Sequence, residues 1–422
     1  MNVAFTKIVP MKIAFVSYEY PPDTAIGGIA TYVRQAAQML AQRGHHVEVF
    51  AASPSRSGCE TSPGLKIHRI QPRDRASFAQ EIALIFAERH RLVQFDVLEG
   101  PDCGADAAVI ATQFPELPLV VKLHTPSYIL QKVGHTPLEG VAKLRFILGA
   151  LRRGQWPNLP PAQPLYDRQS DPEYHHALQA QTIAAPSNAI GQQVQKDWQL
   201  DQSIIDPVPY PYIPTPALLD IPLETQTQRV TFIGRLEIRK GILDLMQAIP
   251  LVLKQYPSAK FCFVGPAWPS PVKHLNMQEY ICKKLHRHRH ALEFTGAVAL
   301  DQIPQYLAQT DICVFPSIWE SFGLVCLEAM AAGRGVVGSS SGGMVELLDG
   351  GNAGLLTPPK HPDLLAKSIL QLLENPDLRQ HYGAIARDRV LSHYSLDYIG
   401  QIQEASYRST IYRQASREIV RL

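Results

Sequence analysis

Two glutamates stand eight positions apart in the segment 315–333, in a pattern that suits the binding of hydroxyl-bearing ligands. Glu320 falls in a loop after a predicted buried strand at 311–315, and Glu328 lies a turn or more into the helix that follows. Carboxylates are good bidentate acceptors for the vicinal hydroxyls of sugar and ribose. The spacing would let the two carboxylates meet different parts of one extended ligand.

The predicted helix that carries Glu328 begins near a glycine. If it starts at Gly323, the backbone amides of Gly323, Leu324 and Val325 are free and face the crevice at the end of the preceding strand. Free amides at the positive end of a helix dipole bind phosphate. The segment therefore predicts a site for a ligand that has both phosphate and hydroxyl groups.

This segment resembles the Glu-x7-Glu signature of the retaining glycosyltransferases of family 4, the glycogen synthase-like group with the GT-B fold. The spacing agrees, as do Pro-Ser before it, Phe322-Gly323-Leu324 within it and Glu-Ala-Met-Ala-x-Gly after it. The resemblance implies that Glu320 binds donor-sugar hydroxyls near the reacting carbon and that Glu328 binds the ribose. The alternative interpretation is a helix cap beside an incidental surface glutamate.

A second element, 232–241, ends a predicted strand and opens a helix, and it resembles the family's Gly-Arg-Leu…Lys-Gly motif. The resemblance implies that Arg235 and Lys240 neutralise the diphosphate of the donor. A guanidinium and an ammonium suit a leaving group that gains negative charge, and they can replace a metal ion. No Asp-x-Asp pair stands at a strand end in this half, so we predict no metal and no cofactor beyond a nucleotide-diphosphate sugar as co-substrate. Taken alone, both cations could be surface charges.

Two further candidates lie in the first half of the chain. Gly27-Gly28 follows the first predicted strand, where glycine lets the backbone approach a ligand closely, although a tight turn needs the same residues. It resembles the family's N-terminal Gly-Gly loop. His124 follows the apolar run 119–123 at the carboxyl end of a predicted strand, where parallel sheets bind ligands. The resemblance implies that His124 hydrogen-bonds the donor sugar or contributes its backbone carbonyl to the reacting centre, whereas a lone histidine at a strand end can also be structural.

The resemblance thus predicts two groups of site residues. The expected catalytic residues are Glu320, His124, Arg235 and Lys240, and the expected donor-binding residues are Gly28, Gly234, Phe322, Gly323, Leu324, Val325 and Glu328.

A chain of 422 residues exceeds what one hydrophobic core usually serves, so two domains and a cleft between them are expected. The order strand, helix, strand at 12–17, 29–43 and 47–51 is typical of a doubly wound parallel sheet, and similar alternation resumes at 229. Six prolines between 206 and 227 indicate a linker. We predict an α/β GT-B architecture of two Rossmann-like doubly wound domains facing a central cleft. Its parts are an acceptor-side domain at 1–215, a nucleotide-sugar-binding domain at 216–395 and, by the resemblance, a helix at 396–422 that crosses back to the first domain.

Charge and composition narrow the partners and the location. Forty basic against 38 acidic residues give a formal charge of +2, which argues against a dedicated nucleic-acid binder. Six scattered cysteines without a CxxC pair, and no long apolar run or signal pattern, predict a soluble cytoplasmic protein. Residues 1–10 are expected to be an extension or a misassigned start. The basic and apolar stretch 143–153 is either a covering helix or a peripheral contact with the inner membrane surface.

By the resemblance, we expect retaining transfer of a hexose-type sugar from a nucleotide-diphosphate donor to an acceptor hydroxyl, in glycan or glycolipid synthesis. The acceptor could be a sugar, a polysaccharide or a lipid, and the base and the donor sugar stay open. Two alternatives are a nucleotide-sugar 2-epimerase of the same fold, expected to lack the Glu320 and Glu328 pattern, and a catalytically silent nucleotide-sugar-binding protein.

Overall fold

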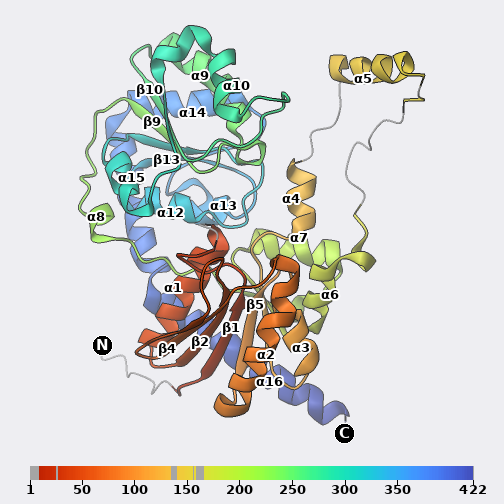
Figure 1. Cartoon of the computed structure of the whole chain (residues 1–422). Helices are drawn as coiled ribbons and strands as arrows, with labels where there is room; N and C mark the ends of the chain where they lie inside the picture. The colour runs from red at the N-terminus through yellow and green to blue at the C-terminus, as the bar shows by residue number, and fades with distance from the viewer. Residues whose placement is uncertain (1–8, 25–26, 135–139, 155, 158–165, 422) are drawn as a thin grey trace.

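Two largely parallel β-sheets form the centres of two α/β domains (Figure 1). The computed structural model describes residues 9–24, 27–134, 140–154, 156–157 and 166–421. The first sheet has eight strands in the order β3-β4-β2-β1-β5-β6-β7-β8, and the second has six in the order β11-β10-β9-β12-β13-β14. In each sheet the chain starts near the middle and moves outward in both directions, which is the doubly wound order predicted from the sequence.

The N-terminal sheet is parallel except for its edge strand β3, which pairs antiparallel with β4. In β1 every residue after Lys12 is buried, because helices cover both faces of a parallel sheet. Ile13 pairs with Val47 on one side and with Val97 on the other. The strands are β1 (Lys12–Ser17), β2 (His46–Ala52), β3 (Gly58–Ser62), β4 (Leu65–Ile70), β5 (Val97–Pro101), β6 (Leu119–Lys122), β7 (Thr182–Ala185) and β8 (Ile205–Pro207). The helices are α1 (Gly28–Gln42), α2 (Arg75–Val93), α3 (Ala108–Gln113), α4 (Ser127–Gly134), α5 (Gly140–Arg152), α6 (Pro172–Gln179) and α7 (Asn188–Trp198), with 3-10 turns η1 (Arg168–Ser170) and η2 (Gln202–Ile204).

The C-terminal sheet pairs its neighbours in parallel throughout the ladders that the structure describes. Its strands are β9 (Arg229–Ile233), β10 (Lys260–Val264), β11 (Leu292–Gly296), β12 (Ile312–Phe315), β13 (Gly335–Ser339) and β14 (Leu355–Thr357). The helices are α8 (Pro216–Leu219), α9 (Ile242–Gln255), α10 (Met277–Lys284), α11 (Ile303–Ala308), α12 (Leu324–Ala331), α13 (Met344–Leu347), α14 (Pro362–Glu374), α15 (Pro376–His393) and α16 (Leu396–Arg421), with 3-10 turns η3 (Ile238–Lys240), η4 (His286–Ala291), η5 (Leu300–Gln302) and η6 (Asp349–Gly351).

The last helix, α16, leaves the C-terminal domain and packs against α1 and the strands β5, β6 and β7 of the N-terminal domain (Figure 1). Its docking depends on the buried carboxylate of Glu99, which accepts hydrogen bonds from Tyr32 on α1 and from Tyr407 on α16, both at 2.7 Å. Gln403 donates to both tyrosine hydroxyls, at 2.9 and 2.7 Å. A polar network therefore joins the chain's end to its first domain.

Three buried apolar clusters hold these layers together. One lies between the N-terminal sheet and α2, and another lies between the C-terminal sheet, α9 and α14. The third covers the α1 face of the N-terminal sheet and continues into the C-terminal domain through Tyr210 and Phe322. The two domains therefore share one continuous core where the linker passes between them.

The basic and apolar stretch 143–153 falls almost wholly within α5, while 135–139, 155 and 158–165 lie outside the described residues. None of the described helices is both long enough and apolar enough to cross a membrane.

We expect Tyr407→Phe to lower the free energy of unfolding by about 1–3 kcal/mol, because it leaves a buried Glu99 oxygen without one of its donors. Tyr412→Phe on the same helix is the matched control, since its ring is 74 % exposed, and it should stay within about 0.5 kcal/mol of the unsubstituted protein. Urea titration of both variants checks this. Equal stability of the two would contradict the proposed role of Glu99 in docking α16.

Candidate active site

An ion pair between Lys240 and Glu320 lies where two loops of the C-terminal domain cross. Lys240 ends η3, and its Nζ donates a hydrogen bond to Glu320 Oε2, which also accepts one from Ser317 Oγ at 3.5 Å. Burial alone would raise the pKa of Glu320, but the positive charges of Lys240 and Arg239 outweigh it and lower that pKa. Glu320 is therefore held as a carboxylate beside an ammonium group.

Glycine makes this loop crossing possible. Gly241 has a φ of 70°, and a Cβ there would lie 1.8 Å from the carbonyl oxygen of Pro316. The amide of Ile318 donates to the carbonyl of Arg239 at 2.8 Å and fixes the same crossing. The close backbone approach thus sets the position of Lys240 relative to Glu320.

The helix α12 begins shortly after Glu320, at the position that the sequence predicts. Gly323 is its N-cap residue, with a φ of 111°, and Leu324 is its first helical residue. The first amides of an α-helix have no partner within the helix, so those of Leu324 and Val325 stay available to an anion. These amides and the ammonium of Lys240 come from the two loops that the crossing joins.

Glu328 lies one turn further along α12. Burial raises its pKa to about 7, and no hydrogen-bond partner for its carboxyl group is found in the described part of the chain. This half-buried carboxyl group is therefore available to accept hydrogen bonds from the hydroxyl groups of a ligand.

Arg235 does not join the Lys240–Glu320 pair in this structure. Its guanidinium lies over the ring of Trp268, 4.9 Å from the ring centroid, and its side chain is 48 % exposed. The preceding residue, Gly234, has a φ of 142°. The carbonyl oxygen of Gly234 packs so closely on Gly265 that a Cβ at Gly265 would lie 2.1 Å from it. The predicted catalytic role of Arg235 would need its side chain to move toward the diphosphate.

His124 lies at the carboxyl end of β6 and is buried. Its amide donates to Asp102 Oδ1 at 3.0 Å, and its Nδ1 is 2.6 Å from the hydroxyl oxygen of Tyr210. The Tyr210 hydroxyl also lies 2.9 Å from the carbonyl oxygen of Leu123. A tyrosine has one proton, so both contacts are satisfied only if Tyr210 donates to Leu123 and His124 donates from Nδ1.

This tautomer leaves Nε2 of His124 as a bare acceptor. Nε2 is buried and has no partner among the described residues. Burial and the nearby charge of Lys122 lower the pKa of His124 to about 3, so the ring is neutral at physiological pH. A neutral imidazole with a free Nε2 lone pair suits a hydroxyl donor such as a sugar.

The glycine loop of the N-terminal domain lies opposite α12. A Cβ at Gly28 would be 4.0 Å from the side chain of Leu324, so the first residues of α1 and of α12 are close together. The ring of Phe322 has a different environment: it packs on Tyr210 and Tyr394, with ring centroids 4.8 and 5.7 Å apart. Its side chain belongs to the core between the domains, so a contact with the donor would have to come from its backbone.

Hydrogen bonds between the domains bring the loops of Glu320 and His124 together. Thr125 Oγ1 is 2.7 Å from Ser321 Oγ, and Ser187 Oγ donates to the Ser321 carbonyl at 2.7 Å. Thr125 follows His124 and Ser321 follows Glu320, so the two predicted catalytic residues lie on loops that touch.

Glu346 adds a second contact between the domains. Its carboxylate accepts from the amides of Asn188 and Ala189, and from the Asn188 side chain, each at 2.9 Å. It therefore caps the N-terminus of α7 from the opposite domain.

The sequence patterns did not identify four residues that the structure places at the site, Tyr210, Thr125, Ser321 and Glu346. Their contacts join segments that are far apart in the sequence, so no local pattern could have identified them.

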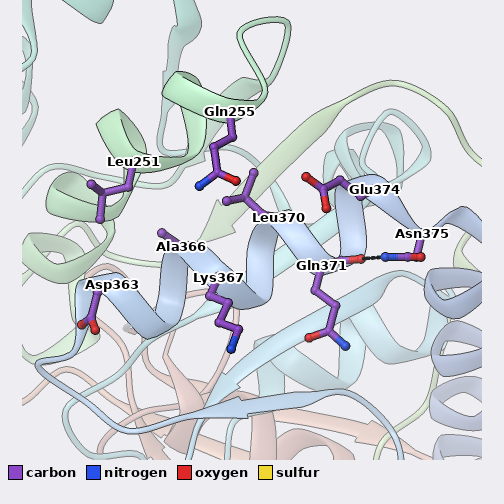
Figure 2. A pocket seen from close by; sticks show the side chains of 9 residues that line it. All are labelled: Leu251, Gln255, Asp363, Ala366, Lys367, Leu370, Gln371, Glu374 and Asn375. Atoms are coloured by element: carbon purple, nitrogen blue, oxygen red, sulfur yellow. Dashed lines mark hydrogen bonds between the residues drawn. The ribbon is translucent and has the colours of Figure 1, made fainter.

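A separate pocket lies between α9 and α14 in the C-terminal domain (Figure 2). Figure 2 shows Asp363, Lys367 and Gln371 along one side of α14, with Leu251 and Gln255 of α9 facing that helix. None of the residues that line it belongs to the predicted site, so this pocket is not the candidate active site.

Comparisons with known proteins identify the family of the chain. A model described as "Glycosyl transferase 4-like domain" matches residues 27–211, and one described as "Glycosyl transferases group 1" matches residues 227–375. The glycogen synthase of Mycobacterium tuberculosis is 24 % identical over 441 aligned positions, covering 96 % of this chain and 95 % of that protein.

Solved structures show the same fold. The sucrose-phosphate synthase of Thermosynechococcus elongatus superposes with a TM-score of 0.69 and 21 % identity, covering 94 % of this chain and 98 % of that one. The HepE protein of Anabaena, solved with UDP and glucose, has a TM-score of 0.64 and 18 % identity, with coverage of 94 % and 99 %. The predicted GT-B fold is thereby confirmed. Because the two glycosyltransferase models together match most of the chain, the chain belongs to the GT-B glycosyltransferases.

We expect Tyr210→Phe to release the His124 ring, because the variant lacks the hydroxyl that accepts from Nδ1. The loss of one such hydrogen bond, about 1–1.5 kcal/mol, would lower turnover about tenfold if it acts only through the orientation of His124. Nitrogen-15 NMR of labelled histidine checks the cause directly: the resonance pair that disappears in His124→Gln should show protonated Nδ1 in the unsubstituted protein and mixed tautomers in the variant.

Tyr212→Phe is the control, since Tyr212 is buried on the same linker two residues later. Unchanged histidine resonances in Tyr210→Phe would mean that the Tyr210 hydroxyl does not select the tautomer.

Proposed function

We propose that the protein transfers a hexose-type sugar from a nucleotide-diphosphate donor to an acceptor hydroxyl and retains the anomeric configuration. The observation that carries this proposal is the Lys240–Glu320 pair beside the N-terminus of α12, with His124 brought opposite by the Thr125–Ser321 hydrogen bond. A nucleotide sugar has a diphosphate between two polyhydroxyl groups, and the site offers cationic and amide groups between two sets of hydroxyl acceptors.

In the proposed complex the diphosphate lies at the start of α12. The amides of Leu324 and Val325 and the Lys240 ammonium would bind its oxygens, and the Glu328 carboxyl would accept from the ribose hydroxyls. Lys240 pairs with Glu320 in the structure, so a diphosphate would take over the ammonium and leave Glu320 free to bind the sugar. HepE, whose structure holds UDP and glucose, has the same fold and supports a donor of this class.

The reacting carbon of the sugar would lie between Glu320 and His124. Glu320 would accept hydrogen bonds from sugar hydroxyls, and the free Nε2 of His124 would accept one more from the other domain. These contacts fix the sugar, and the charges at α12 stabilise the diphosphate as the bond to the anomeric carbon breaks.

Retention follows in this proposal from attack on the face that the diphosphate leaves. The bond from the anomeric carbon to the diphosphate oxygen breaks with its electron pair going to the diphosphate. The acceptor oxygen forms the new bond on the same side, and its proton passes to the departing diphosphate oxygen. The N-terminal domain would supply the acceptor, and the product would be a glycan or glycolipid.

We further propose that the protein needs no metal ion for this step, because Lys240 and the helix amides supply the positive charge. Within the described residues no group of three or more histidine, cysteine, aspartate or glutamate side chains is placed to hold one. We expect the rate of sugar transfer to be the same in excess EDTA as with added magnesium.

We expect Lys240→Ala to weaken binding of the matching nucleoside diphosphate by about 10–100-fold, the range for losing a charge-assisted hydrogen bond worth about 1.5–3 kcal/mol. Lys254→Ala, an exposed lysine on the neighbouring helix α9, is the control and should bind like the unsubstituted protein. Calorimetry against UDP, GDP and ADP with EDTA present measures both and identifies the base.

Glu320→Gln separates binding from transfer. It should keep nucleotide affinity within a few-fold while product formation from the corresponding sugar nucleotide falls at least tenfold, because its contacts are with the sugar. If the unsubstituted protein binds the nucleotide but neither transfers nor hydrolyses the sugar, it is a catalytically silent binding protein. If it inverts C2 of the sugar in the nucleotide sugar without an acceptor, it is an epimerase.

A further inference from the structure

An uncovered apolar stripe runs along α5 of the N-terminal domain. Leu144, Leu148 and Leu151 are 57, 48 and 53 % exposed, and their spacing of four and three residues places them on one face of the helix. Trp156 follows and is 90 % exposed. Figure 1 shows α5 standing away from both domains, beyond the end of α4.

The stripe lies in a strongly basic stretch. Residues 140–156 contain four basic residues, Lys143, Arg145, Arg152 and Arg153, and no acidic residue. This concentration contrasts with the near balance of charge in the whole chain, which has a formal charge of +2. Arg152 is exposed and directly follows Leu151, so positive charge borders the apolar face.

We propose that α5 docks this protein on the surface of a lipid bilayer that contains anionic lipids. In the docked state the three leucines would enter the interface between headgroups and acyl chains, and the exposed Arg152 beside them would meet lipid phosphates. Exposed leucines on one face, a tryptophan at the interface and flanking arginines are the features by which amphipathic helices bind such surfaces. Apolar area and positive charge each contribute to this binding, and anionic lipid attracts the charge.

Charge argues against a second copy of the chain as the occupant of this stripe. Pairing α5 with α5 of another molecule would bring two helices of three positive charges each into contact, with no acidic residue on either helix to compensate. A lipid surface with negative phosphates removes that repulsion and covers the leucines at the same time.

In the sequence α5 follows α4, which lies beside the candidate active site. The helix α4 starts three residues after His124 and contacts η3, the turn that ends in Lys240. The proposal concerns membrane binding alone and goes beyond the proposed sugar transfer.

The test is sedimentation of the full chain with vesicles of phosphatidylcholine alone and with vesicles that also contain phosphatidylglycerol. We expect binding to the anionic vesicles that weakens as salt is added, and little binding to the neutral ones. Leu144→Gln/Leu148→Gln/Leu151→Gln should weaken the binding at least tenfold. Leu84→Gln/Leu92→Gln/Leu391→Gln replaces three exposed leucines on α2 and α15 and should bind as the unsubstituted protein does.

Tryptophan emission gives a second measurement. Anionic vesicles should shift it to shorter wavelength, and Trp156→Phe should abolish the shift. Equal vesicle binding by the two triple variants, or no binding by the unsubstituted protein, overturns the proposal. So does self-association that is lost only in the α5 triple variant, because a second copy would then occupy the stripe. Unchanged melting temperature and nucleoside-diphosphate affinity in that variant keep this test separate from the test of sugar transfer.

Discussion

The ion pair between Lys240 and Glu320 is the interaction on which the site depends. Two charged groups withdrawn from water are tolerated only when each has a partner in good geometry, so the backbone must hold both loops in one arrangement. Gly241 allows that arrangement, because any Cβ there would collide with the Pro316 carbonyl. The same crossing places the start of α12 beside the ammonium group. The proposed contacts with the diphosphate and the sugar, and the turn before α9, therefore all depend on a single close approach between two segments of the C-terminal domain.

The other half of the site comes from the N-terminal domain, and one continuous core fixes its position. Tyr210 of the linker contacts His124 through its hydroxyl and Phe322 through its ring, so it links the imidazole to the loop of Glu320. The Glu99 network ties α16 to the N-terminal sheet beneath the same region, where the Lys122 ammonium lies over the rings of Tyr32 and Tyr210. A change in the angle between the domains would consequently move His124 relative to Glu320.

How much the sequence could predict depended on the range of the interactions. The helix that follows Gly323, the strand before it and the doubly wound order are set by local pattern, and the structure confirms them. The Tyr210–His124 and Thr125–Ser321 contacts join residues 86 and 196 positions apart, and no local periodicity encodes such pairs. The stacking of Arg235 on Trp268 could not be foreseen for the same reason, because the motif specifies a cation and not the neighbour that holds it.

Several buried polar groups of the candidate site have no hydrogen-bond partner among the described residues. Most buried polar atoms in folded proteins are hydrogen-bonded, since leaving one unpaired costs stability. Here Nε2 of His124, Oδ2 of Asp102 and Nε1 of Trp319 are buried without a partner among the described residues, and all three belong to the loops that meet between the domains. The neighbouring contacts of Ser321 and Glu346 are fully made, so the unpaired atoms do not reflect loose packing. These three unpaired groups lower the stability of an interface that is otherwise well packed. A bound ligand with several hydroxyl groups would complete their hydrogen bonds, which explains why they are kept.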